Sequence, residues 1–101
     1  IADGDLLRVW NERGEILAGA VVTERVMPGV AVVATGAWYD PETRGRPGSR
    51  EKHGNSNVLT RDKGSSLLSQ APSAQTALVE VARYEGTPPP VTAHEAPPST
   101  L

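Results

Sequence analysis

The sequence predicts a mainly β fold, a small barrel or sandwich, on the basis of two observations. Glycine and proline together account for 19 of the 101 residues, which favours short elements joined by turns over long helices. Three short runs rich in β-branched residues also follow one another at intervals of about ten residues, separated by turn residues. With 38% apolar residues and no phenylalanine, the core is expected to consist mainly of Val, Leu, Ile and Ala.

The first two expected strands flank a tight turn. Leu6–Trp10 is short and apolar around a central arginine, and residues 11–14 form the turn. Gly14 stands where a positive φ is expected. The second strand is expected over residues 16–23, in which Gly19 suggests a bulge or the close approach of another backbone.

The middle of the chain alternates between turns and one further strand. A Met-Pro-Gly sequence at residues 27–29 predicts a turn, and the β-branched residues 30–34 after it predict a third strand. Residues 40–56 are a long polar loop, and loops of this length inside a compact domain are usually functional or disordered. Residues 58–60 form a brief strand at most.

The last third holds weaker signals. Residues 65–69 suit the start of a helical turn. The run TALVEVARY at residues 76–84 fits a strand by its alternation and a helix by its apolar face, and its short length favours the strand. Residues 87–101 contain five of the nine prolines and are expected to be extended. We therefore divide the chain into a β-barrel domain, residues 1–86, and a proline-rich tail, residues 87–101.

Charge and composition exclude several classes of partner. The net charge of -2 predicts no nucleic-acid partner, and no apolar run approaches the roughly 18 residues of a membrane span. The charge is uneven, because residues 42–63 carry six cations against three anions. This basic segment suggests an anionic ligand, although a solvated loop explains it equally simply. The chain has no cysteine and no initiator methionine, and we expect it to be a monomeric C-terminal piece of a longer protein.

Catalytic motifs are missing from the sequence. His53 and His94 are separated by 41 positions without a cysteine or a paired carboxylate at ligand spacing, so they are expected to be ordinary polar residues and not metal ligands. No serine lies in a G-x-S-x-G elbow, and no phosphate loop of the P-loop or dinucleotide type is present. The chain alone is therefore not expected to be catalytic.

Binding is the better-supported function. The amides of Asn55, Asn57 and Gln70 offer planar pairs of donors and acceptors that match the edge of a pterin or purine. Gly54 lets a backbone approach a ligand closely. Arg50 and Lys52 could in addition meet a phosphate. The same residue types are also the ordinary residues of turns, so the pattern alone leaves both interpretations open.

Four segments in order resemble a known family. DGDLLRVWNERGEILAGAVVTERVMPGV, GAWYDP, KHGNSNVLT and SSLLSQAPSAQTALVEVARYEG are similar to the C-terminal domain of the dimethyl sulfoxide reductase family, over nearly all of residues 2–95. The second and third segments look most like the branch of biotin sulfoxide, trimethylamine N-oxide and dimethyl sulfoxide reductases. The resemblance implies a six-stranded double-psi β-barrel that caps a bis(molybdopterin guanine dinucleotide) molybdenum cofactor bound together with the other domains of the parent enzyme.

The resemblance also implies which residues face the cofactor. The HGNPN segment of the family matches His53, Gly54, Asn55 and Asn57, with Ser56 in place of the proline. The glutamine of its AQGPSAQ segment matches Gln70, and its tryptophan near the cofactor matches Trp38. Where the family has glycine after that glutamine, this chain has Ala71, which predicts strain if the position needs a positive φ. The family holds its molybdenum from another domain, so no residue here is expected to be catalytic.

Two readings of the function follow. The first is the cofactor-binding domain of a molybdenum oxidoreductase that reduces S-oxides or N-oxides. The sequence does not distinguish between a cytoplasmic and a periplasmic location of this bacterial enzyme. The second is a free-standing β-barrel interaction module without a cofactor. A domain separated from its enzyme should expose an apolar patch with Trp38 or Tyr39, whereas a free module should not.

Overall fold

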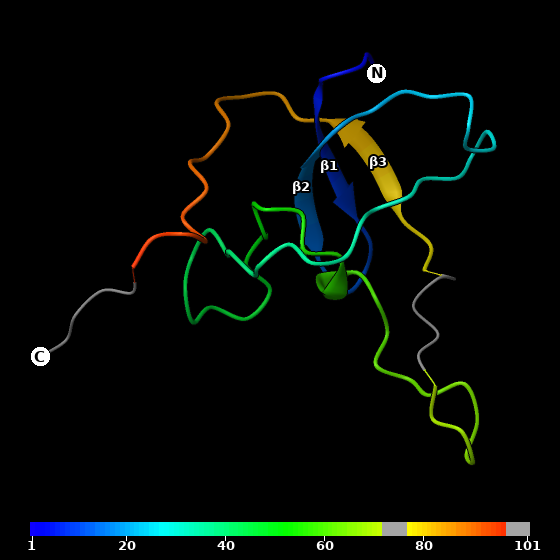
Figure 1. The fold of residues 1–101 in the computed structure, drawn as a ribbon. Helices are drawn as coiled ribbons and strands as arrows, with labels where there is room; N and C mark the ends of the chain where they lie inside the picture. The colour runs from blue at the N-terminus through cyan, green and yellow to red at the C-terminus, as the bar shows by residue number, and fades with distance from the viewer. Residues whose placement is uncertain (72–76, 97–101) are drawn as a thin grey trace, which may run out of the picture.

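A three-stranded antiparallel sheet forms the centre of the molecule (Figure 1). The computed structural model describes residues 1–71 and 77–96. The strands are β1 (Leu6–Trp10), β2 (Glu15–Gly19) and β3 (Glu80–Arg83), in the order β2-β1-β3, and a single 3₁₀ turn, η1 (Ser56–Val58), lies beside them. The mainly β prediction is confirmed, as are the strand over Leu6–Trp10 and the choice of strand for the run ending at Tyr84. Residue 76, at the start of that run, lies outside the described residues.

The turn between β1 and β2 is closed by an asparagine side chain. Asn11 Oδ1 accepts hydrogen bonds from the backbone N–H groups of Arg13 and Gly14, while the Asn11 N–H donates to the Gly14 carbonyl. Gly14 does not have the positive φ that we expected. It is required for a different reason, because a Cβ atom there would lie 2.8 Å from the carbonyl oxygen of Val58.

The core is small and lies on one face of this hairpin. Val9, Ile16 and Leu59 are buried together, and Val9 pairs with Ile16 on β2 and with Val81 on β3. Ile16 is completely buried. Leu59 comes from the segment after η1, so the core fixes the position of that segment against the sheet.

The long loop extends the sheet beyond β2. Glu51 forms a parallel bridge to Ile16, in which the Leu17 N–H donates to the Glu51 carbonyl and the Glu51 N–H to that of Glu15. On its other side Glu51 forms an antiparallel bridge to Pro41. The loop predicted over residues 40–56 is therefore attached to the sheet edge through Glu51, to which Pro41 near its start is paired, while its middle turns through Gly45 and Gly48 at positive φ.

Several sequence predictions are wrong. A six-stranded double-psi barrel is not seen, because the described residues form three strands. Residues 30–34 form no strand, and Val32 is 76% exposed, since β-branched residues hold a strand only where a partner strand pairs with them. The second strand ends at Gly19, which shows neither a bulge nor a close contact. Residues 58–60 are not a strand, because η1 and the bend after it occupy this stretch.

Other local predictions are confirmed. The turn at residues 27–29 is present, with Gly29 at φ 79° and the Val30 N–H donating to the Met27 carbonyl. Residues 65–69 make one helical turn, in which the Gln70 N–H donates to the Ser66 carbonyl. Residues 87–96 form no helix or strand, and residues 97–101 of the tail lie outside the described residues.

The chain exposes more surface than a compact monomer of its size. Its accessible surface is 7831 Å², whereas a folded monomer of 10.7 kDa exposes about 5,500 Å². Trp38 and Tyr39 are 63% and 55% exposed, which is the outcome expected of a domain separated from its enzyme and not of a free module. None of the helices in the described part of the chain has the length and apolar character needed to cross a membrane.

Candidate functional site

A buried carboxylate shapes the loop that carries most of the predicted site residues. Glu51 is completely buried, and each of its carboxylate oxygens accepts two backbone hydrogen bonds. Oε1 accepts from the N–H groups of Asp40 and His53, and Oε2 from those of Gly54 and Asn55, at distances of 2.7 to 3.1 Å. Gly54 permits this arrangement with a φ of 88°. Residues 53–55 thus wrap around one anion and are fixed by it.

The two asparagine side chains of this loop have different surroundings. Asn55 Oδ1 accepts the Asn57 N–H and thereby caps η1. The Asn57 side chain is exposed and makes no hydrogen bond with the described residues. Asn55 is half-buried, and its Nδ2 group likewise makes no hydrogen bond with them. Two amide groups are therefore available for a ligand on a loop whose backbone is fixed.

Trp38 lies next to this loop and Gln70 does not. His53 Nδ1 is 3.0 Å from the Trp38 carbonyl oxygen and must donate to it, because a carbonyl only accepts. Gln70 belongs to the separate turn at residues 65–70, where its Nε2 donates to the Ser66 carbonyl over 2.8 Å. This turn projects away from the sheet in Figure 1. The positive φ expected at position 71 falls instead on Gln70, at 51°, so the strain predicted for Ala71 is absent.

The two histidines, 41 positions apart in the sequence, lie next to each other. The His94 ring centroid is 5.2 Å from that of His53, edge to face, and 5.2 Å from that of Trp38. Both distances are in the range of favourable ring contacts. The tail residue His94 thus packs against two residues of the predicted site, a contact that no local sequence pattern could indicate.

A buried ion pair lies under the same contact. Thr92 donates to the two carboxylate oxygens of Asp40, from its backbone N–H over 2.6 Å and from its hydroxyl over 2.7 Å. Lys52 Nζ lies 3.1 Å from Asp40 Oδ1 and donates to the Thr92 hydroxyl. Burial raises the pKa of Asp40, but the hydrogen bonds from Thr92 and Lys52 outweigh it and lower the pKa from 3.8 to about 2.

The lowered pKa of Asp40 predicts a loss of stability in acid. Because the folded state favours the ionised carboxylate, the contribution is complete above pH 3.8 and disappears as the pH falls through about 2. The free energy of unfolding should therefore fall by about 1–2 kcal/mol over this window on account of Asp40. Urea unfolding at several pH values measures it, and the difference between wild type and Asp40→Asn should shrink toward pH 2. A difference that stays constant with pH would contradict this assignment.

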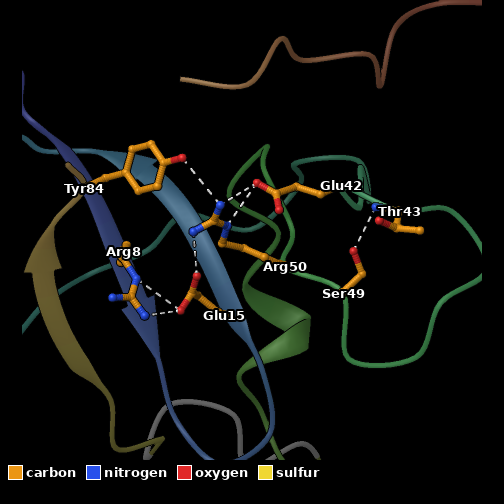
Figure 2. Close-up of polar contacts among 7 residues, drawn as sticks. All are labelled: Arg8, Glu15, Glu42, Thr43, Ser49, Arg50 and Tyr84. Carbon is orange, nitrogen blue, oxygen red and sulfur yellow. Dashed lines mark hydrogen bonds and ion pairs between the residues drawn. The ribbon is translucent and has the colours of Figure 1, made fainter. Parts of the chain in front are cut away.

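Arg50 is the centre of a second ionic network (Figure 2). It donates to Glu15 and twice to Glu42, and its guanidinium lies 4.9 Å from the centroid of the Tyr84 ring. Glu15 also accepts two hydrogen bonds from Arg8. Burial raises the pKa of Glu15, but the bonds from Arg8 and Arg50 lower it overall. The network joins β1, β2 and the end of β3 to the base of the long loop.

These pairings change the interpretation of the basic segment. Arg50 and Lys52, for which contact with a phosphate was one possibility, form ion pairs with carboxylates of the chain itself. Arg44 and Arg46, at the tip of the loop, are exposed, and their guanidinium groups have no partner among the residues that the structure describes. Any anion that this segment binds would therefore be met by the tip and not by the base of the loop.

An open apolar hollow of about 880 Å³ lies beside the site. Its floor is the sheet face with Leu7, Val9 and Val81, its wall is the extended segment 20–35, and His53 and Gly54 lie at its border. The exposed apolar side chains of the wall would be covered in a larger protein.

Comparison with known protein families places the chain among cofactor-binding domains. Residues 1–78 match the family of the molydopterin dinucleotide binding domain, and the chain belongs to this family. This match and the similar reductases described next together confirm the resemblance to the dimethyl sulfoxide reductase family.

The similar proteins are reductases. Over 87 residues the chain is 58% identical to trimethylamine-N-oxide reductase 1 of Escherichia coli K12, and this match covers 86% of the chain and 10% of the relative. Over 97 residues, 96% of the chain, it is 53% identical to a trimethylamine-N-oxide reductase of Salmonella typhi and 47% identical to a dimethyl sulfoxide/trimethylamine N-oxide reductase of Cereibacter sphaeroides. These two matches cover 11% and 12% of the relatives. The chain thus spans about a tenth of the length of the relatives that it matches.

Proposed function

We propose that this chain is the cofactor-binding domain of a bis(molybdopterin guanine dinucleotide) molybdenum reductase that acts on N-oxides or S-oxides. The observation that carries the proposal is the loop at residues 51–57, whose backbone is fixed by Glu51 while the amides of Asn55 and Asn57 stay available. The family membership of the chain and the reductases among its relatives support it.

The available groups fit the edge of a pterin or guanine. Such an edge alternates donors and acceptors in one plane, and a carboxamide is the side chain that matches it without adding charge. Asn57 offers a whole carboxamide and Asn55 its Nδ2 donor. Asn57, Asn55 and Gly54 would hold the dinucleotide, with Trp38 and His53 beside them. Gln70 lies on the separate turn at residues 65–70 and would contact the cofactor from there.

In the parent enzyme, the molybdenum centre and the residues of this chain would have different roles. The two-electron reduction of the oxide is supplied by the molybdenum centre when it is bound. The residues of this chain bind and orient the dinucleotide, and none of them is catalytic. The remaining domains of the reductase are its partners, and they would cover the apolar hollow and the exposed Trp38 and Tyr39.

Removing one amide should lower the amount of bound cofactor. In the reductase, Asn57→Ala is expected to reduce the molybdopterin content per protein about ten-fold, because a lost hydrogen-bonded pair contributes about that factor in affinity. The content is measured as the fluorescence of the oxidised pterin released from purified protein. Unchanged content in Asn57→Ala would contradict the role of this amide.

A neighbouring substitution serves as the control. Ser56 is the first residue of η1, its N–H makes no hydrogen bond with the described residues, and Asn55 before it is extended at φ -72° and ψ 107°. Proline fits this position. Ser56→Pro should therefore keep the wild-type content. A wild-type protein that carries no pterin would favour the alternative, an interaction module without cofactor.

A further inference from the structure

The proline-rich segment after β3 returns to the loop that carries the predicted site. Thr92 is the point of attachment, because it gives both a backbone and a side-chain hydrogen bond to Asp40, which is only 2% exposed. The attachment joins positions that are 52 residues apart in the sequence. Two residues further on, His94 packs its ring against Trp38 and His53.

The contact is connected to the amide loop through two short paths. Asp40 donates its N–H to Glu51 Oε1 and accepts the Lys52 N–H at its carbonyl. Glu51 in turn holds the N–H groups of Gly54 and Asn55. The other path runs from His94 through the His53 ring, which itself donates to the Trp38 carbonyl. Every link in both paths is a direct contact.

We infer that residues 92–94 act as a clamp that positions the amide loop for the dinucleotide, with Thr92 as its anchor and His94 as the side chain that orients His53 and Trp38. The inference rests on the proposed function of the loop. Thr92 and His94 are positioning residues here, since they act through Asp40, His53 and Trp38.

The test is made on the intact reductase with two measurements. One is the rate at which the pterin dinucleotide is released in mild denaturant, followed by the fluorescence of the oxidised pterin. The other is the melting temperature of the cofactor-free protein. His94→Ala should release the dinucleotide about five-fold faster, the factor that the loss of a ring contact brings, with a nearly unchanged melting temperature. His94→Phe keeps a ring at this position and should restore the wild-type rate.

Thr92→Val removes the hydroxyl of the anchor and should also speed release. Its matched control is Thr87→Val, because Thr87 lies in the same proline-rich segment, is exposed and makes no hydrogen bond with the described residues. Thr87→Val should leave both measurements unchanged.

The possible outcomes distinguish a failure of the clamp from a failure of the proposed function. If Asn57→Ala loses the dinucleotide while His94→Ala and Thr92→Val release it at the wild-type rate, the clamp is refuted and the cofactor site stands. If the wild-type reductase carries no dinucleotide, both the proposed function and the clamp that rests on it are refuted. A release rate that changes only in proportion to the melting temperature would also refute a positioning role.

Discussion

Replacing Glu51 with glutamine is expected to destabilise the chain by about 3 kcal/mol, because a carboxamide cannot accept all four of the backbone hydrogen bonds that the carboxylate accepts. Both oxygens of Glu51 receive two backbone N–H groups each. Whichever way the amide is turned, its NH₂ group faces two buried donors and leaves them without an acceptor. The substitution is nearly isosteric, so the loss reports hydrogen bonding and not packing.

Urea unfolding followed by tryptophan fluorescence measures this loss. Glu85→Gln makes the same chemical change at a side chain that is 78% exposed, and it should cost little. If Glu51→Gln unfolds at the same urea concentration as Glu85→Gln, the carboxylate does not hold the loop. In the reductase the same variant should lose bound dinucleotide, because residues 53–55 lose the anion around which they wrap.

Replacing Gly14 with alanine is expected to cost about 2 kcal/mol, the range found when atoms are forced into a packed region. The new Cβ atom would lie 2.8 Å from the Val58 carbonyl oxygen and 3.4 Å from the Val58 Cβ. A backbone oxygen cannot move aside as the end of a side chain can. Relief therefore requires η1 and Leu59 to shift away from the hairpin, which opens the core.

Gly19→Ala provides the matched control on the neighbouring strand. A Cβ atom at Gly19 would meet no atom within 4 Å, and its φ is ordinary. Alanine there should leave stability unchanged or raise it by about 0.5 kcal/mol through the entropy of the unfolded chain. Urea unfolding of the two variants under one set of conditions gives the comparison. Equal stability of the two would show that the hairpin and η1 are not in contact in solution.

Local patterns predicted the elements whose partners are close in sequence. Leu6–Trp10 and the turn after it were recognisable because the hairpin pairs a strand with its immediate neighbour and closes on Asn11. Residues 30–34 have the same β-branched composition and form no strand, because pairing depends on a partner that composition cannot reveal. The six-stranded barrel was expected from the family resemblance and not from composition, and the described residues contain three strands.

The site likewise contains residues that the local sequence predicted and residues that it could not predict. The H-G-N-x-N segment was recognisable because its amides are adjacent in the chain, whereas Glu51 looked like one more charge between Arg50 and Lys52. Its burial depends on the bridge to Ile16, 35 positions away. The attachment of Thr92 to Asp40 spans an even longer separation. No spacing rule connects such positions.

The place of β1 in the sheet has a consequence for how the protein folds. β1 comes first in the sequence yet lies between β2 and β3, and its pairing from Trp10 to Glu80 spans 70 positions. The hairpin of β1 and β2 can form in microseconds, while β3 must wait for the closure of a far longer loop. During that wait one edge of β1 is unpaired, and an unpaired edge recruits strands from other chains. A nascent chain that stalls before residue 80 would expose the edge of β1, the strand that carries the buried Val9, and would therefore be prone to aggregate.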